Sequence, residues 1–236
     1  MDDRLYFRQL LSGHSFATDD PAAQQMVNFV YLIGDRSTGE CAVIDPAYAV
    51  AEIVDIAAGD DMRITDVLVT HFHPDHVGGS FGRMEIEGIS RLLELQPVRI
   101  HANRHEVPWI TRSTGVSEKE ITAHDGGDKV MVGELDVTLV HTPGHTPGSQ
   151  CFHANGCLIS GDTLFLDGCG RTDLPGSDPA AMFDSLRLLD SLDPSTVIFP
   201  GHRYSAPPCE TLEQVRQHNF VLKPKDKEQW LSVFGS

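Results

Sequence analysis

Short apolar runs alternate with amphipathic stretches along this chain. Residues 27–34 (VNFVYLIG) and 41–46 (CAVIDP) are apolar, and the polar segment DRSTGE between them is typical of a turn, so the two runs predict a β-hairpin. Residues 48–58 have the mostly apolar body of a packed helix, and 64–70 (ITDVLVT) predict the next strand.

The same features recur further along the chain. They predict strands at 98–102, 129–142, 149–162 and 196–200, where the second and third of these ranges each contain two strands about a turn. Helices are expected at 179–190 and at 211–222, the latter closing the fold. Strands followed by a helix, twice over, indicate two β-sheets packed together with helices on their outer faces, which is an α+β fold.

No linker-like stretch divides the chain, so residues 1–236 are expected to form a single domain. The segment near 80–97 resembles an insertion, and its residues Ile89, Leu92, Leu93 and Leu95 predict a short amphipathic helix. Two interpretations of this segment remain open. It is either a surface helix that packs its apolar face or a lid beside the candidate site described below.

Composition narrows the classes of function. The chain has 34 acidic and 18 basic residues and a formal net charge of −16, which disfavours nucleic acid and anionic membranes as partners. No apolar run approaches the roughly 18 residues that span a bilayer. The five cysteines form no CxxC pair. A protein of the reducing cytoplasm is therefore expected, without a leader segment.

Residues 70–79 read THFHPDHVGG and directly follow an apolar run. Imidazole and carboxylate side chains hold borderline and hard metal ions, so this cluster predicts part of a metal site. Three later residues also lie in loops at the ends of predicted strands, where a rigid scaffold presents functional groups: His145, Asp162 and His202.

These residues suffice for two divalent ions, with Zn the first choice and Fe or Mn the alternatives. His71, His73 and His145 would hold one ion, and Asp75, His76 and His202 the other. Asp162 would bridge the two ions, which could then share a hydroxide.

The pattern HxHxDH followed by a distant His, Asp and His resembles the metallo-β-lactamase-fold superfamily, over roughly residues 27–204. That resemblance implies a four-layer αβ/βα sandwich with the metals at one edge of the two sheets. The segments GDTLFLDGCGRTDLPG (161–176) and PGHRYS (200–205) are most similar to the glyoxalase II-like branch, which includes hydroxyacylglutathione hydrolases and persulfide dioxygenases.

The resemblance favours a metal-dependent hydrolase that cleaves a small-molecule thioester or related ester by attack of a metal-bridging hydroxide. Asp75 is expected to bind metal and to orient the nucleophile. Arg171 and Tyr204 are candidate substrate-binding residues, with an ion pair to Asp173 and a buried structural tyrosine as the respective alternatives. A monomer or homodimer is expected.

A persulfide dioxygenase is the main alternative, because GCGRTD (168–173) resembles the dioxygenase motif. One Fe(II) would then bind His71, His145 and Asp162. The following LPGSDP is more similar to small hydrolases of the branch, and a lactonase is a further alternative.

Only 34 residues follow His202, which leaves little room for the helical domain that holds glutathione in the longer enzymes. A cluster of Lys223, Lys225 and Lys227 could still attract an anionic thiol carrier.

Overall fold

Two six-stranded mixed sheets form the centre of the computed structural model, which describes residues 4–82 and 84–235. The first sheet has the strand order β1 (Leu5–Leu11), β2 (Phe29–Asp35), β3 (Glu40–Ile44), β4 (Arg63–Leu68), β7 (Arg99–Asn103) and β8 (Ile121–His124). The second has the order β14 (Glu210–Thr211), β13 (Val197–Pro200), β12 (Cys157–Gly161), β11 (Gln150–Ala154), β10 (Leu135–His141) and β9 (Lys129–Val132).

Parallel pairing lets several strands end at the same edge. In the first sheet β3, β4, β7 and β8 run parallel, whereas β1, β2 and β3 are antiparallel. In the second sheet the pair β12–β13 is parallel, with β13 antiparallel to β14. The loops that follow β4, β12 and β13 carry most of the residues that the sequence analysis singled out.

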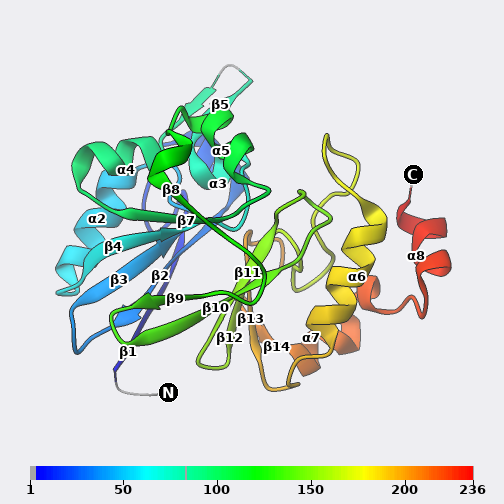
Figure 1. The fold of residues 1–236 in the computed structure, drawn as a ribbon. Coiled ribbons are helices and arrows are strands. Elements are labelled where there is room, and N and C mark those ends of the chain that lie inside the picture. The colour runs from blue at the N-terminus through cyan, green and yellow to red at the C-terminus, as the bar shows by residue number, and fades with distance from the viewer. Residues whose placement is uncertain (1–3, 83, 236) are drawn as a thin grey trace.

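Helices cover the outer face of each sheet (Figure 1). Against the first sheet lie α2 (Val50–Gly59), α4 (Ile89–Leu95) and α5 (Val107–Thr114), and against the second lie α6 (Pro179–Asp190), α7 (Leu212–His218) and α8 (Lys227–Phe234). Shorter elements are α1 (Pro21–Met26), α3 (Pro74–Val77), the hairpin β5 (Gly79–Phe81) and β6 (Met84–Ile86), η1 (Glu118–Glu120) and η2 (Phe220–Leu222). The predicted four-layer αβ/βα arrangement is confirmed.

The core between the sheets consists of side chains that alternate along facing strands. Tyr31 and Ile33 of β2 pack with Leu139 of β10 and Phe152 of β11, and all four are at most 1% exposed. Interdigitation of this kind fixes the sheets relative to each other, and therefore fixes the loops at their common edge.

The predicted closing helix at 211–222 is wrong in its end point. Helix α7 ends at His218, because the next residue, Asn219, is fully buried and bonded outside the helix. Its Nδ2 donates to the carbonyl oxygens of Phe165 and Gly168, and its Oδ1 accepts from the amide of Gly168. The chain then continues through η2 into α8, which the sequence analysis missed along with β1 and α5.

The segment near 80–97 forms the β5–β6 hairpin and α4; residue 83 lies outside the described residues. Ile89 and Leu92 of α4 are fully buried in the core of the first half, as the amphipathic pattern predicts. Among the described residues, no helix is long and apolar enough to cross a membrane.

Candidate metal centre

Seven histidine and aspartate side chains from four loops meet at one edge of the two sheets. His71, His73, Asp75 and His76 follow β4 and continue into α3. His145 lies in the loop between β10 and β11, Asp162 directly follows β12, and His202 follows β13. The structure thus brings together every residue that the sequence analysis proposed as a metal ligand, and their role as ligands stays a prediction.

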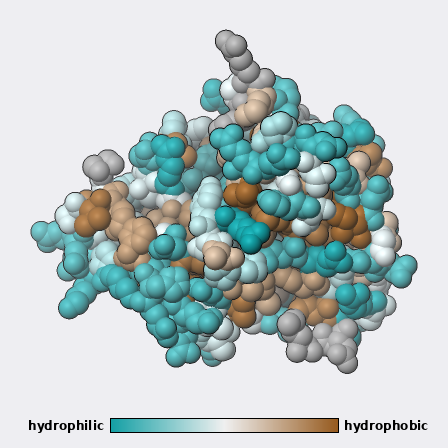
Figure 2. All heavy atoms as spheres, turned by 180° about the vertical axis from the view of Figure 1, so that it is seen from behind, coloured by the Kyte–Doolittle hydropathy of each residue, from teal (hydrophilic) through white to brown (hydrophobic). Residues whose placement is uncertain are grey.

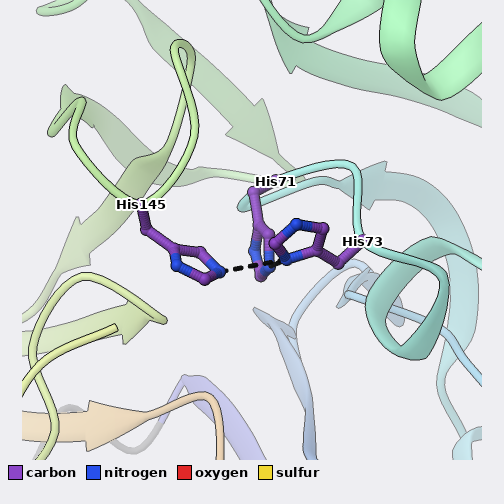
Figure 3. Close-up of side chains that lie close together, drawn as sticks. All are labelled: His71, His73 and His145. Atoms are coloured by element: carbon purple, nitrogen blue, oxygen red, sulfur yellow. Dashed lines mark hydrogen bonds between the residues drawn. The ribbon is translucent and has the colours of Figure 1, made fainter. Parts of the chain in front are cut away.

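The first group consists of three imidazoles whose rings converge (Figure 3). His73 Nδ1 lies 3.0 Å from His71 Nε2 and 3.0 Å from His145 Nε2. Three ring nitrogens from three positions, aimed at one another, match the donor set that binds Zn in proteins.

The second group consists of Asp75, His76 and His202. His76 Nε2 and His202 Nε2 are 3.2 Å apart, and Asp75 Oδ2 lies 3.6 and 3.5 Å from these two nitrogens. Asn28 Nδ2 donates to the same Asp75 oxygen at 3.1 Å, which fixes the orientation of that carboxylate.

Asp162 lies between the two groups. Its Oδ2 is 3.7 Å from His145 Nε2 and 3.3 Å from His202 Nε2, and its Oδ1 is 3.5 Å from His76 Nε2. The Oδ1 atom is buried and has no hydrogen-bond partner. Because an unpartnered buried carboxylate oxygen is costly, its position among imidazoles fits a bridging ligand of two cations.

Four of the five imidazoles are oriented by a contact to the nitrogen that faces away from the groups. Such outer contacts fix the tautomer and leave the inner nitrogen free to bind a metal. The four contacts, each 2.8–3.0 Å long, join His71 Nδ1 with Thr70 Oγ1, His76 Nδ1 with Asp45 Oδ2, His145 Nδ1 with the Arg171 carbonyl oxygen, and His202 Nδ1 with the Met26 carbonyl oxygen.

The electrostatics of the two groups differ. Burial and the neighbouring His145 lower the pKa of His73 to about 4, so its ring is neutral and offers a lone pair at neutral pH. Burial also opposes protonation of His76, but Asp162, Asp75 and Asp45 outweigh it and raise its pKa to about 10. Negative charge therefore accumulates around the second group, which favours a cation there.

Asp45 was not predicted from the sequence. It contacts His76 of the second group and Thr70, the neighbour of His71 of the first group. Besides its bond to His76, Asp45 accepts from the Thr70 amide at 2.8 Å and from the Thr70 hydroxyl. It has a left-handed backbone with φ 54° and is 3% exposed. A signal for it exists in CAVIDP, where an aspartate ends a predicted strand just before a proline.

Glu106, which precedes α5, was also missed. Its carboxylate accepts from the Phe72 amide at 2.8 Å, the Thr146 hydroxyl at 2.8 Å and the Gly148 amide at 2.7 Å. Burial raises the pKa of Glu106 to about 7 against the effect of these hydrogen bonds. Glu106 thereby joins the loop of His71 and His73 to the loop of His145.

The GCGRTD segment contacts the candidate ligands Asp162 and His145 through its backbone. A Cβ at Gly170 would lie 2.0 Å from the Asp162 carbonyl oxygen and 2.9 Å from the His145 ring, so only glycine fits there. The Arg171 carbonyl holds His145, whereas the Arg171 guanidinium donates to Asp173 at 2.9 and 2.8 Å. A role for Arg171 in substrate binding stays a prediction.

A cavity of about 990 Å³ opens above the two groups. Tyr204 lies at its rim, 59% exposed, and its ring stacks on that of His202 with centroids 4.8 Å apart and an interplanar angle of 4°. Tyr204 is therefore not the buried structural tyrosine that the sequence left open, and its hydroxyl is available to a ligand.

Comparisons with known proteins agree with this geometry. A family model described as the Metallo-beta-lactamase superfamily matches residues 24–202. A hydroxyacylglutathione hydrolase from Rhodospirillum rubrum is 38% identical over 205 residues, which cover 85% of this chain and 72% of that protein. A Bacillus velezensis protein named "Probable polyketide biosynthesis zinc-dependent hydrolase BaeB" is 27% identical, over 89% of this chain and 88% of that protein.

Structural similarity to a solved protein extends over almost the whole chain. The crystal structure of ETHE1 from Myxococcus xanthus superposes with a TM-score of 0.78 and 26% identity, over 98% of this chain and 90% of the other.

Proposed function

The chain belongs to the metallo-beta-lactamase superfamily, and from this premise we propose that it is a metal-dependent hydrolase of small-molecule thioesters or related esters. The observation that carries the proposal is the position of Asp162 between two donor groups that open into one cavity. The hydroxyacylglutathione hydrolase relatives support thioester chemistry.

We propose that two divalent ions, Zn first and Fe or Mn as alternatives, bind at these residues. His71, His73 and His145 would hold one ion, Asp75, His76 and His202 the other, and Asp162 both. When bound, such ions lower the pKa of water and polarise a carbonyl.

Residues of the chain would orient the attacking water and the substrate. Asn28 Nδ2 donates to Asp75 Oδ2, and this contact supports a role for Asp75 in orienting the attacking water as well as in binding metal. Tyr204 stands at the rim, where its hydroxyl can donate to a substrate oxygen. A thiolate leaves without a strong general acid, because a thiol is far more acidic than an alcohol.

Further features of the proposal follow from the whole chain. We propose one domain over residues 1–236 with an insertion near 80–97. The five cysteines are free, which fits the reducing cytoplasm as the compartment. We propose a monomer or homodimer.

Persulfide dioxygenation is the second candidate, favoured by the GCGRTD segment and by the likeness to ETHE1 over 98% of the chain. It would use one Fe(II) on His71, His145 and Asp162, a two-histidine, one-carboxylate set.

Elemental analysis of protein purified without added metal separates the two candidates. About two Zn per chain, with thioester hydrolysis and no oxygen uptake, supports the hydrolase. One Fe per chain with oxygen uptake on a persulfide supports the dioxygenase instead.

Asp162→Ala should lose metal and activity, whereas Asp136→Ala, which removes an exposed ion pair with Lys129, should keep both. Full turnover by Asp162→Ala would refute the assignment of the site.

A further inference from the structure

The cavity above the metal centre has walls made largely of apolar and aromatic side chains. On one side Phe72 and Trp109 stack, with ring centroids 4.9 Å apart and an interplanar angle of 17°. On another side the C-terminal segment presents Phe220, Val233 and Phe234. The cavity volume of about 990 Å³ is that of a site for a ligand of substantial size.

The C-terminal wall is a fixed part of the fold. Trp230 of α8 is fully buried, and its Nε1 donates to the Pro179 carbonyl at the start of α6 at 2.7 Å. Its ring lies 4.2 Å from that of Phe234, which in turn lies 5.9 Å from Phe220. The apolar surface therefore exists before any ligand binds, which lowers the cost of binding.

This wall also leaves apolar side chains open to solvent at the mouth of the cavity. Phe220 is 52% exposed and Val233 is 61% exposed. Figure 2 shows apolar side chains in patches on a surface that is otherwise mostly hydrophilic. Exposed apolar groups that border a functional cavity mark a place where an apolar ligand binds.

Fixed positive charge is scarce in the same cavity. Apart from the site histidines, Arg171 is the one cationic side chain among the described residues that line it, and Arg171 already pairs with Asp173. Asp167 and Asp173 add negative charge to the lining.

Two of the three lysines of the tail are engaged elsewhere. Lys223 Nζ donates to the carbonyls of Arg216 and Gln217 at 2.6 and 3.0 Å, and Lys227 Nζ lies 2.6 Å from Asp184. Lys225 is exposed and does not line the cavity. An anionic carrier such as glutathione therefore meets little complementary charge among the described residues that line the cavity.

We infer that the substrate of this site is a thioester with a large apolar acyl group, which the aromatic walls bind, on a thiol carrier whose charges are not recognised. The inference rests on the proposed function for the nature of the scissile bond. The inferred substrate differs from a polar short-chain acylglutathione in both the acyl group and the thiol carrier.

Binding of uncleavable thioethers tests the inference without turnover. Calorimetric titration of the metal-containing protein would compare S-octyl-N-acetylcysteamine, S-ethyl-N-acetylcysteamine and S-octylglutathione. The S-octyl compound should bind about 100-fold more tightly than the S-ethyl compound, since the methylenes of the longer chain leave water. The two S-octyl compounds should agree within about threefold. Equal affinity for the two chain lengths, or a glutathione compound tighter by about tenfold, would overturn the inference.

Two surface variants locate the binding to the C-terminal wall. Phe220→Ser and Val233→Ser change largely exposed side chains, and each should weaken S-octyl binding about fivefold and S-ethyl binding much less. Met131→Ser is the matched control, because Met131 is 49% exposed on β9 and does not line the cavity. Wall variants that bind the S-octyl compound as tightly as the control would contradict the inference.

The two proposals fail in different ways. If S-octyl compounds bind as expected but no thioester is hydrolysed, the proposed function is wrong and the apolar site stands. If thioesters are hydrolysed while chain length has no effect on binding, the function stands and this inference is wrong.

Discussion

The carboxylate of Asp45 connects the outer sides of both donor groups. One oxygen accepts from the Thr70 amide, and the other contacts His76 Nδ1 and the Thr70 hydroxyl, which itself holds His71 Nδ1. His71 and His76 belong to different groups of the candidate metal centre. Their ring orientations therefore depend on one buried side chain.

Asp45→Asn should lower metal affinity about 10- to 100-fold, because one acceptor oxygen is replaced by an amide nitrogen, which cannot accept a hydrogen bond from His76 or Thr70. Asparagine tolerates the φ of 54° at this position, so backbone strain does not add to the effect. Competition with a chromophoric chelator measures the affinity.

Asp61→Asn is the matched control, since Asp61 also has a positive φ, 59°, but is exposed and remote from the site. Equal loss of affinity in both variants would contradict the role given to Asp45.

Asp66 is a buried, charged residue outside the candidate metal centre. Burial alone would raise its pKa, but contacts with His101 and Arg99 and the Thr65 hydroxyl outweigh burial and lower the pKa to about 2. Because the folded-state pKa is depressed, the ionised form stabilises the fold above about pH 4, and this contribution is lost as pH falls toward about 2.

Asp66→Asn should therefore reduce the free energy of unfolding by about 2 kcal/mol near pH 6, with the difference from the native protein shrinking as pH falls from about 4 to about 2. Urea unfolding across this pH range measures the difference. Asp136→Asn, in an exposed ion pair, should show little effect at any pH. A pH-independent difference at Asp66 would show that its charge is not the cause.

At the scale of elements, α5 delivers Glu106 to two loops of the site. The helix packs Val107 and Ile110 into the core of the first half, which places the preceding glutamate between the loops of residues 71–73 and 145–148. None of the proposed metal ligands lies on α5, yet the position of this helix sets the distance between the two loops.

Glu106→Gln should destabilise the protein by about 1–3 kcal/mol, because the amide nitrogen would face a buried donor and leave it without a partner. Metal affinity should fall as well, since His145 would no longer be held at its distance from His71 and His73. Urea unfolding of the metal-free protein and chelator competition measure the two effects separately.

Glu118→Gln, on the exposed η1, serves as the control. Loss of stability without any change in metal affinity would mean that Glu106 supports the fold but does not position the site.

At the scale of the whole molecule, the candidate metal ligands lie across the junction of the two halves. His71, His73 and His76 come from the first half, and His145, Asp162 and His202 come from the second. A bound ion would therefore connect the halves and stabilise the folded state by mass action.

Removal of metal by a chelator should lower the melting temperature, and addition of Zn should restore it. A ligand at 1,000 times its Kd contributes about 4 kcal/mol to the folded state. Differential scanning calorimetry measures the shift. The Asp162→Ala protein should show a much smaller shift, and an unchanged melting temperature on chelation of the native protein would contradict metal binding across the halves.

Local pattern was sufficient for most strands and for α6. The hairpin of β2 and β3 and the helix at Pro179–Asp190 were predicted because apolar spacing and turn residues lie close together in sequence. β1, α5 and α8 were missed because their burial depends on partners far along the chain. Trp230, for example, is buried by α6, which ends 40 residues earlier.

The sequence by itself determined which side chains are candidate metal ligands, since ligand type and position after a strand are local properties. Only the tertiary structure decided how those side chains are oriented, because Asp45, Glu106 and the Arg171 carbonyl act through contacts between distant segments. It also decided what surrounds the site. One wall of the cavity comes from the C-terminal segment, which Asn219 joins to the loop after β12 and Trp230 joins to the start of α6.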